Sequence, residues 1–115
     1  MACSDETTDL TASPSVAKLT FRMPHAMTLT SVRASVTTAP VGANIIVDIK
    51  DGGSSIFTTN LLNIDDGDKT SVGSSTTPNI TDTSLASDAE ITVFCTQIGS
   101  STAGAGLKIW LIGTR

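Results

Sequence analysis

The chain has 115 residues and a mass of 11.8 kDa, which is enough for one domain and excludes most multidomain machines. Its 19 Thr and 14 Ser contrast with only 3% aromatic and 16% charged residues. With 39% hydrophobic residues and a net charge of −4, this is not the composition of a disordered chain. The excess of Thr, Val, Ile and Gly over strong helix formers predicts an all-β protein.

The balance of charge argues against nucleic acids and membranes as partners. Seven Lys and Arg stand against eleven Asp and Glu, and the pI is near 4.6. No two basic residues are adjacent, whereas nucleic-acid binding needs clustered cations that displace counterions from phosphates. We therefore expect no nucleic-acid partner and, for the same reason, no binding to anionic membrane surfaces.

The N-terminus carries no targeting signal. The sequence MACSDETTDL is acidic and lacks an apolar region, so we expect synthesis in a cytoplasm. Because the chain starts with Met1, we expect a complete gene product. Cys3 lies in a polar stretch and Cys95 in a predicted strand, which predicts one mobile and one buried thiol rather than a disulfide or zinc set.

The first 17 residues differ from the rest of the chain. Residues 1–17 show no sustained periodicity and predict an extended arm that is ordered only if it packs on something. Apolar and polar residues then alternate over 18–23, which is typical of a half-buried strand, and Pro24-His25 ends it. We therefore divide the chain into an N-terminal arm, 1–17, and one domain, 18–115.

The next segment, 27–36, contains a change of parity. Its apolar residues have odd numbers before residue 30 and even numbers after residue 31: Met27, Leu29, Val32, Ala34 and Val36. A strand buries every second residue, so this change predicts a β-bulge near Thr30-Ser31. A turn region with Pro and Gly follows over 37–42.

Further strands are predicted on both sides of glycine-rich turns. Ile45, Val47 and Ile49 mark a strand, the hairpin turn 50–53 contains two glycines, and 55–59 returns antiparallel to that strand. After an acidic turn over 65–68, we predict a short strand over 69–72.

Two longer strands complete the chain. Alternation predicts a strand over 90–98 and another over 107–112, separated by a turn rich in Gly, Ser and Ala. About seven or eight short strands with frequent turns predict an antiparallel β-sandwich or jelly-roll-like barrel.

No arrangement of residues indicates catalysis. His25 is the only histidine, it lies in a turn, and no serine has a GxSxG elbow. We therefore expect no enzyme activity and no cofactor. The candidates for a metal site are Asp65, Asp66 and Asp68, but they lack the spacing of an EF-hand, so we expect a solvated turn and no metal.

Trp110 is the one residue with the chemistry of a binding platform. Sugar sites stack apolar sugar faces on Trp or Tyr, and this chain has one Trp and no Tyr. Trp110 has the opposite parity to Leu107, Ile109 and Leu111, so it faces outward if those residues face the core. It then either packs against the arm or a neighbouring subunit, or serves as a ligand platform.

A set of motifs goes beyond composition: Met27–Val36, Ala39–Gly42, Ile46–Ile49, Ser55–Phe57, Leu85–Val93, Gln97–Ser100 and Ala103–Leu107. Together they resemble a β-sandwich module common in the virion proteins of tailed bacteriophages. The resemblance covers about residues 18–113. The chain departs from it at Phe94-Cys95-Thr96, where the family often carries an acidic residue before its Gln.

The resemblance implies a structural role in a virion, on the capsid surface or in a tail appendage, often as an oligomer. A short arm and a small sandwich suit a capsid decoration (cement) protein on the outside of the head. We expect the major capsid protein as partner and a homotrimer as the oligomer. The interaction candidates are Asp9, Leu10, Val16 and Trp110. The alternative is a receptor- or glycan-binding tail or fibre protein.

Overall fold

The computed structural model describes residues 3, 6–13 and 15–115. This part of the chain forms eight strands and no helix. It therefore holds no helix that is long and apolar enough to cross a lipid bilayer. The strands are β1 (Leu19–Arg22), β2 (Met27–Ser35), β3 (Ile45–Asp51), β4 (Ser54–Ser55), β5 (Leu62–Ile64), β6 (Ser84–Leu85), β7 (Glu90–Gln97) and β8 (Lys108–Thr114).

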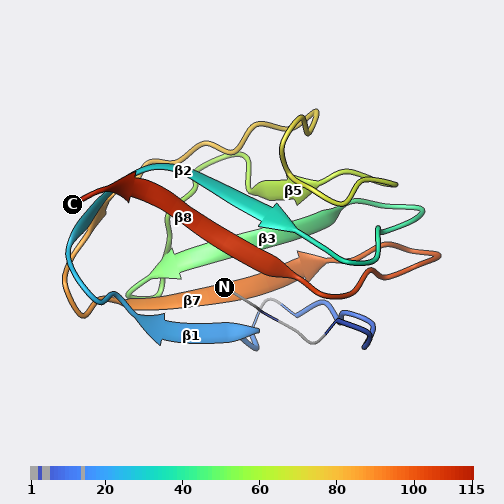
Figure 1. Ribbon diagram of the computed structural model, residues 1–115, viewed down its shortest axis with the longest axis horizontal. Helices are drawn as coiled ribbons and strands as arrows, with labels where there is room; N and C mark the ends of the chain where they lie inside the picture. The colour runs from blue at the N-terminus through green and yellow to red at the C-terminus, as the bar shows by residue number, and fades with distance from the viewer. Residues whose placement is uncertain (1–2, 4–5, 14) are drawn as a thin grey trace.

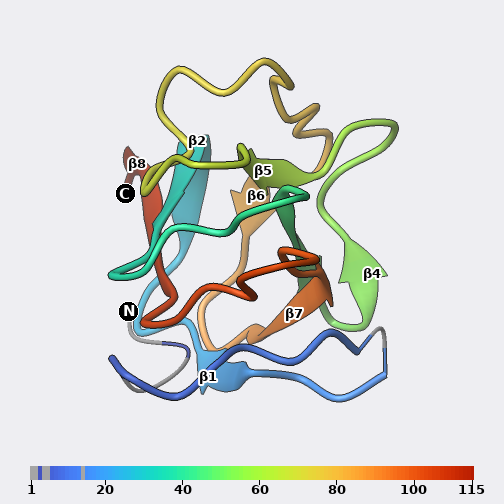
Figure 2. The same cartoon turned by 90° about the vertical axis from the view of Figure 1, so that its right-hand side faces the viewer.

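The described strands form two antiparallel sheets that face each other. One sheet has the order β1-β7-β3-β4, with β5 also paired to β3, and the other has the order β6-β2-β8. In Figure 1, β2 and β8 cross in front of β3 and β7, and Figure 2 shows the same two layers from the end. The predicted antiparallel β-sandwich is confirmed.

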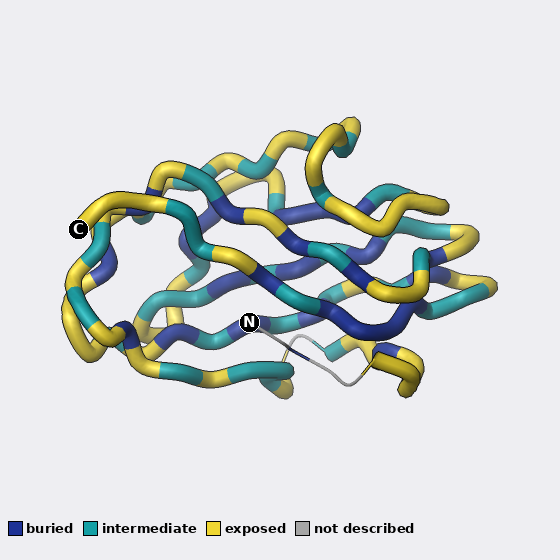
Figure 3. Tube along the Cα trace, viewed as in Figure 1, coloured by how far each residue is buried: buried dark blue, intermediate teal, exposed yellow. Residues whose placement is uncertain are grey.

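The core lies between the two sheets because alternate residues of each strand point inward. In β3, Ile45, Val47 and Ile49 are at most 1% exposed, while the residues between them are half-buried. β7 follows the same alternation, and Figure 3 shows the buried segments along the inner strands. Burying each such aliphatic side chain stabilises the fold by about 1.5–3 kcal/mol.

The predicted bulge in β2 is confirmed. Leu29 pairs with Gly113 and Ser31 with Ile112, so Thr30 is an extra residue without a partner of its own in the register. Its Oγ1 instead donates a hydrogen bond to the Ile112 carbonyl oxygen at 3.0 Å. The extra residue restores the inward orientation after the change of parity, because the apolar residues before and after the bulge both reach the core.

The predicted hairpin between β3 and β4 is also present. Gly52 and Gly53 have φ angles of 60° and 93°, which glycine adopts without strain. The returning strand is shorter than the predicted 55–59, because only Ser54–Ser55 pairs with β3. Ile56 and Phe57 are buried, and Phe57 bridges to Ile80 instead of continuing along β3.

The predicted strand over 69–72 is wrong. Only Thr70 makes an isolated bridge, to Ser35, and the residues around it form bends and turns. A strand that was not predicted, β5, pairs with β3, and its three residues are all buried. These residues, Leu62-Asn63-Ile64, are too few for alternation to mark a strand, and the polar Asn63 is buried with its side-chain amide donating to the Leu61 carbonyl oxygen at 3.1 Å.

The N-terminal segment packs on the sandwich. The Leu10 amide donates to the Gly104 carbonyl oxygen at 2.9 Å, and the Cys3 amide donates to that of Leu107 at 2.7 Å. Both side chains join the core, with Leu10 3% and Cys3 7% exposed. The expectation of a mobile thiol at Cys3 is therefore wrong, because an apolar neighbourhood inside the same chain buries it. The described arm residues need no further partner to be in place.

We predict that Gly113→Ala destabilises the protein by about 1–3 kcal/mol, because overpacking against backbone forces the strands apart. A Cβ at Gly113 would lie 2.2 Å from the Thr28 carbonyl oxygen and 3.0 Å from Leu29 Cα. Urea unfolding followed by the fluorescence of Trp110 measures the loss. The exposed neighbour Thr114, changed to Ala, is the control, and equal midpoints for the two variants would contradict the prediction.

Candidate interaction surface

Trp110 lies on the outer face of the smaller sheet. Its neighbour Ile109 is buried in the core, and the strand alternation turns the indole outward, where it is 46% exposed. Across the ladder, Trp110 pairs with Arg33 of β2. A large aromatic residue and an arginine are therefore cross-strand neighbours on the outer face of this sheet.

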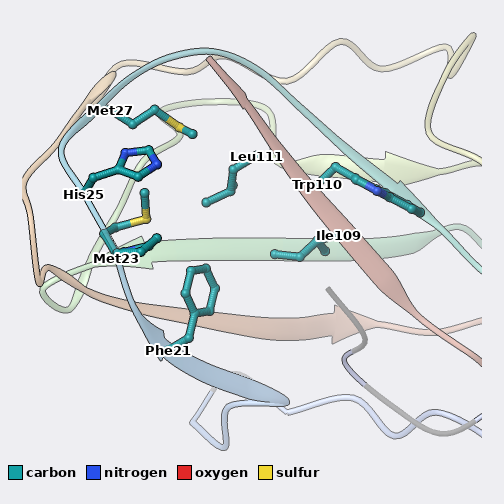
Figure 4. Close-up of a pocket in the computed structure, with 8 residues that line it drawn as sticks. Phe21, Met23, His25, Met27, Ile109, Trp110 and Leu111 are labelled. Atoms are coloured by element: carbon teal, nitrogen blue, oxygen red, sulfur yellow. The ribbon is translucent and has the colours of Figure 1, made fainter. Parts of the chain in front are cut away.

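A hollow of about 250 Å³ lies between the two sheets at their open side. It is located where β1 ends one sheet and β8 ends the other, so no ladder closes it. We call the whole gap between the edges of β1 and β8 the β1–β8 seam, of which this hollow is one part. In Figure 4 the side chains around the hollow come from β1, the turn after it, the start of β2 and β8: Phe21, Met23, His25, Met27, Ile109 and Leu111. The Trp110 indole points away from them.

A second hollow, of about 290 Å³, lies on the other side of Trp110. Arg33, Val72 and Ile112 are among its lining residues, and Val72 is exposed. Trp110 borders both hollows, so they form one surface around it, which we call the Trp110 surface. None of the described residues that line it is Asp or Glu.

The three arm candidates lie elsewhere. Asp9 is exposed and bridges to Ala105, Leu10 belongs to the core, and Val16 is 62% exposed. None of the three lines either hollow beside Trp110. The structure thus offers Asp9 and Val16 to a partner but keeps the Leu10 side chain inside its own fold.

The acidic loop holds neighbouring loops together. Asp65 Oδ1 accepts a hydrogen bond from Ser74 Oγ at 2.7 Å, and Oδ2 accepts one from the Ser75 amide at 2.9 Å. These bonds lower the pKa of Asp65 below its usual value. Asp66 Oδ1 accepts from the Gly42 amide at 3.0 Å. Among the described residues, Asp65, Asp66 and Asp68 are not part of any group of three or more potential metal ligands.

The remaining titratable candidates do not form a reactive centre in the described part of the chain. Burial raises the pKa of the Cys3 thiol to about 11 and also raises that of Cys95, so both thiols are protonated and unreactive at neutral pH. His25 lies in the turn before β2, with Nδ1 3.0 Å from the Ala26 carbonyl oxygen. Its side chain lines the hollow in the seam. Strand periodicity could not predict this, because His25 lies in a turn.

Two carboxyl groups, those of Asp51 and Asp82, interact although no sequence pattern signals this pair. Asp51 ends β3 and Asp82 lies in the loop before β6, and the two are far apart in the sequence. Burial and a hydrogen bond with Asp82 raise the pKa of Asp51 above its usual value. Two carboxyls alone do not make a metal site, and the pair opposes folding slightly when both groups are charged.

Comparisons of the chain with protein-family models, curated proteins and solved structures find no match. The geometry of the Trp110 surface and the motif resemblance therefore carry the functional argument. Chemically, this surface can bury a partner's apolar side chains and pair its charged groups with Arg33.

We predict that Asp65→Asn lowers the unfolding temperature at neutral pH, because an amide cannot accept both hydrogen bonds from Ser74 and Ser75. The pKa of Asp65 is lowered by folding, so its stabilisation is present above the usual value of 3.8 and lost as the pH falls through the lowered value. The difference from the unmodified protein should therefore shrink in acid. Thermal unfolding across pH measures it, with Asp68→Asn in the same loop as control; a difference that does not change with pH would contradict the prediction.

Proposed function

We propose that the protein is a structural component of a tailed-bacteriophage virion, a decoration (cement) protein that binds the outer capsid surface. Its partner is the major capsid protein, it acts as a homotrimer, and it has no enzymatic role or cofactor. The observation that carries this proposal is the set of phage-module motifs over about residues 18–113, placed on a β-sandwich with an exposed apolar surface.

The composition of the Trp110 surface supports a contact with protein. Trp and Arg are enriched at the centres of protein interfaces, where large side chains become fully desolvated. Here Trp110 and Arg33 are neighbours across the ladder, and Val72 and Ile112 extend the apolar area. Once a partner covers it, an exposed tryptophan such as Trp110 contributes far more to binding than small residues around it.

The mechanism is mechanical. Capsid maturation leaves joints between coat subunits, and a bound trimer adds buried interface across each joint. Three linked copies bind with a higher effective concentration than one, so modest contacts at each site give stable occupancy. The exposed Val16 in the arm adds a second apolar contact outside the Trp110 surface.

A receptor- or glycan-binding tail protein is the second candidate. The observation in its favour is the exposure of Trp110 next to a hollow, because an indole face stacks on the apolar face of a sugar ring. The scarcity of aromatic residues makes this candidate the weaker one, since the chain has one Trp and no Tyr.

The position of the chain in the particle tests both candidates. We predict that gold-conjugated antibodies against this protein label phage heads densely and leave the tails unlabelled. Label at the tail tip would favour the receptor-binding candidate instead. Purified particles without any label, from an infection in which the protein is expressed, would overturn the virion assignment altogether.

A matched pair of substitutions tests the surface. Trp110 and Val41 are both 46% exposed, so both can be changed to Ser without opening the core. If the Trp110 surface binds the capsid, Trp110→Ser reduces occupancy of stripped capsids by roughly 30-fold or more, as expected for the loss of a hot spot. Val41→Ser should leave occupancy within about twofold of that of the unmodified protein, because Val41 lines neither hollow beside Trp110. Equal occupancy for the two variants would remove Trp110 from the interface.

A further inference from the structure

The β1–β8 seam is closed at one end by the protein's own arm and open at the other. At the closed end the Cys3 amide pairs with the Leu107 carbonyl oxygen, and the Cys3 and Leu10 side chains fill the space between the sheets. Towards the other end lies the hollow lined by Met23, Met27 and Leu111. The arm thus shows how this seam accepts an extended segment: by pairing with the chain that leads into β8 and burying apolar side chains.

The edge of β8 provides backbone groups beside the hollow. Only β2 pairs with β8 among the described strands. The Leu107 carbonyl oxygen is bonded to the arm, and the Ile112 carbonyl oxygen accepts from Thr30 of β2. Backbone groups alternate sides along a strand, so those of Leu111 point away from β2, towards the side that the arm uses at Leu107. An added strand can pair there.

The hollow has the size and flexibility to receive one side chain. Its volume of about 250 Å³ is below the roughly 300–1,000 Å³ of small-molecule pockets, so one large apolar side chain suits it better than a ligand. Met23 and Met27 line it, and methionine adapts its shape to what it contacts.

Charge defines the rest of the occupant. Arg33, with its permanently charged guanidinium group, lines the neighbouring hollow, on the other side of Trp110. The strands β2, β6 and β8 contain no Asp or Glu, although the whole chain has a net charge of −4. Of their two basic residues, Lys108 forms an ion pair with Glu6 of the arm, so Arg33 is the one considered for a partner. Acidic side chains next to an apolar anchor therefore complement this edge.

We propose that the open half of the β1–β8 seam is a docking groove for an extended segment of another protein, with acidic residues flanking a large apolar residue. The segment pairs with the backbone of β8 at Leu111 and inserts its apolar side chain between Met23, Met27 and Leu111. That the segment belongs to a capsid protein rests on the proposed function; the groove itself does not.

Selection from a random peptide library displayed on ribosomes or yeast tests the groove without any virion. The library is selected on the full-length protein, and the enriched peptides are then synthesised as probes. We expect alternating acidic and apolar sequences that shift the emission of Trp110, the only tryptophan of the chain, and the backbone amide signals of Leu111 and Gly113.

Three variants locate the binding site. Met27→Lys replaces an apolar side chain that lines the groove, and His25→Asp adds a negative charge beside it, so both should weaken binding of the enriched peptides by about tenfold or more. Met27 is only partly buried, so the lysine can extend its ammonium group to solvent, and thermal unfolding verifies that each variant is folded. Val41→Lys, a change at an exposed valine that lines neither hollow, is the control and should not affect binding.

Several outcomes would overturn the groove. These are a selection without enriched peptides, enriched peptides that are basic or that bind all three variants equally, and amide shifts confined to β4 or another edge. A dimer in solution that dissociates on Met27→Lys would show that a second copy of this chain covers the seam instead. Capsid labelling without peptide binding would overturn the groove alone, and peptide binding without virion labelling would overturn the proposed function alone.

Discussion

The extra residue at Thr30 is the constraint on which the arrangement of the smaller sheet depends. A strand can bury only alternate residues, yet the apolar residues of β2 change parity at its middle. The bulge resolves this conflict, and the Thr30 hydroxyl bonds to Ile112 of β8. It also brings Gly113 against the backbone of Thr28, where no side chain would fit. With β8 held in this register, Ile109 faces the core and Trp110 faces outward.

The candidate interaction surface lies where the two sheets end without sharing a strand. Hydrogen bonds join strands within each sheet but not the last strands of opposite sheets, so the side between β1 and β8 needs another cover. The arm supplies that cover near Leu107 and leaves the hollow beside Leu111 open. The exposed Trp110 lies next to this hollow, so an apolar surface and the backbone of β8 at Leu111 come together at one place. Attachment to a capsid, as we propose, would use such a place.

Several structural features could be predicted from short stretches of sequence. The bulge, the hairpin at Gly52-Gly53 and the outward orientation of Trp110 depend on alternation and on the backbone freedom of glycine, which act over a few residues. The strand expected over 69–72 is reduced to one bridge, because the chain turns at Val72 directly after Thr70 has paired with Ser35. β5 was missed because it has only three residues, too few for a period of two to stand out, and because its polar Asn63 is buried.

By itself, the sequence determined the all-β class, the strand faces and the position of the bulge, because these depend on side-chain period and local backbone conformation. Only the tertiary structure decided what lies across the space between the sheets. It joined Cys3 and Leu10 to the core, tied Asp65 to Ser74 and Ser75, and placed Met23 and Met27 opposite Leu111. Such contacts link residues far apart in the chain, and they exist only once the two sheets have packed, so no local pattern encodes them.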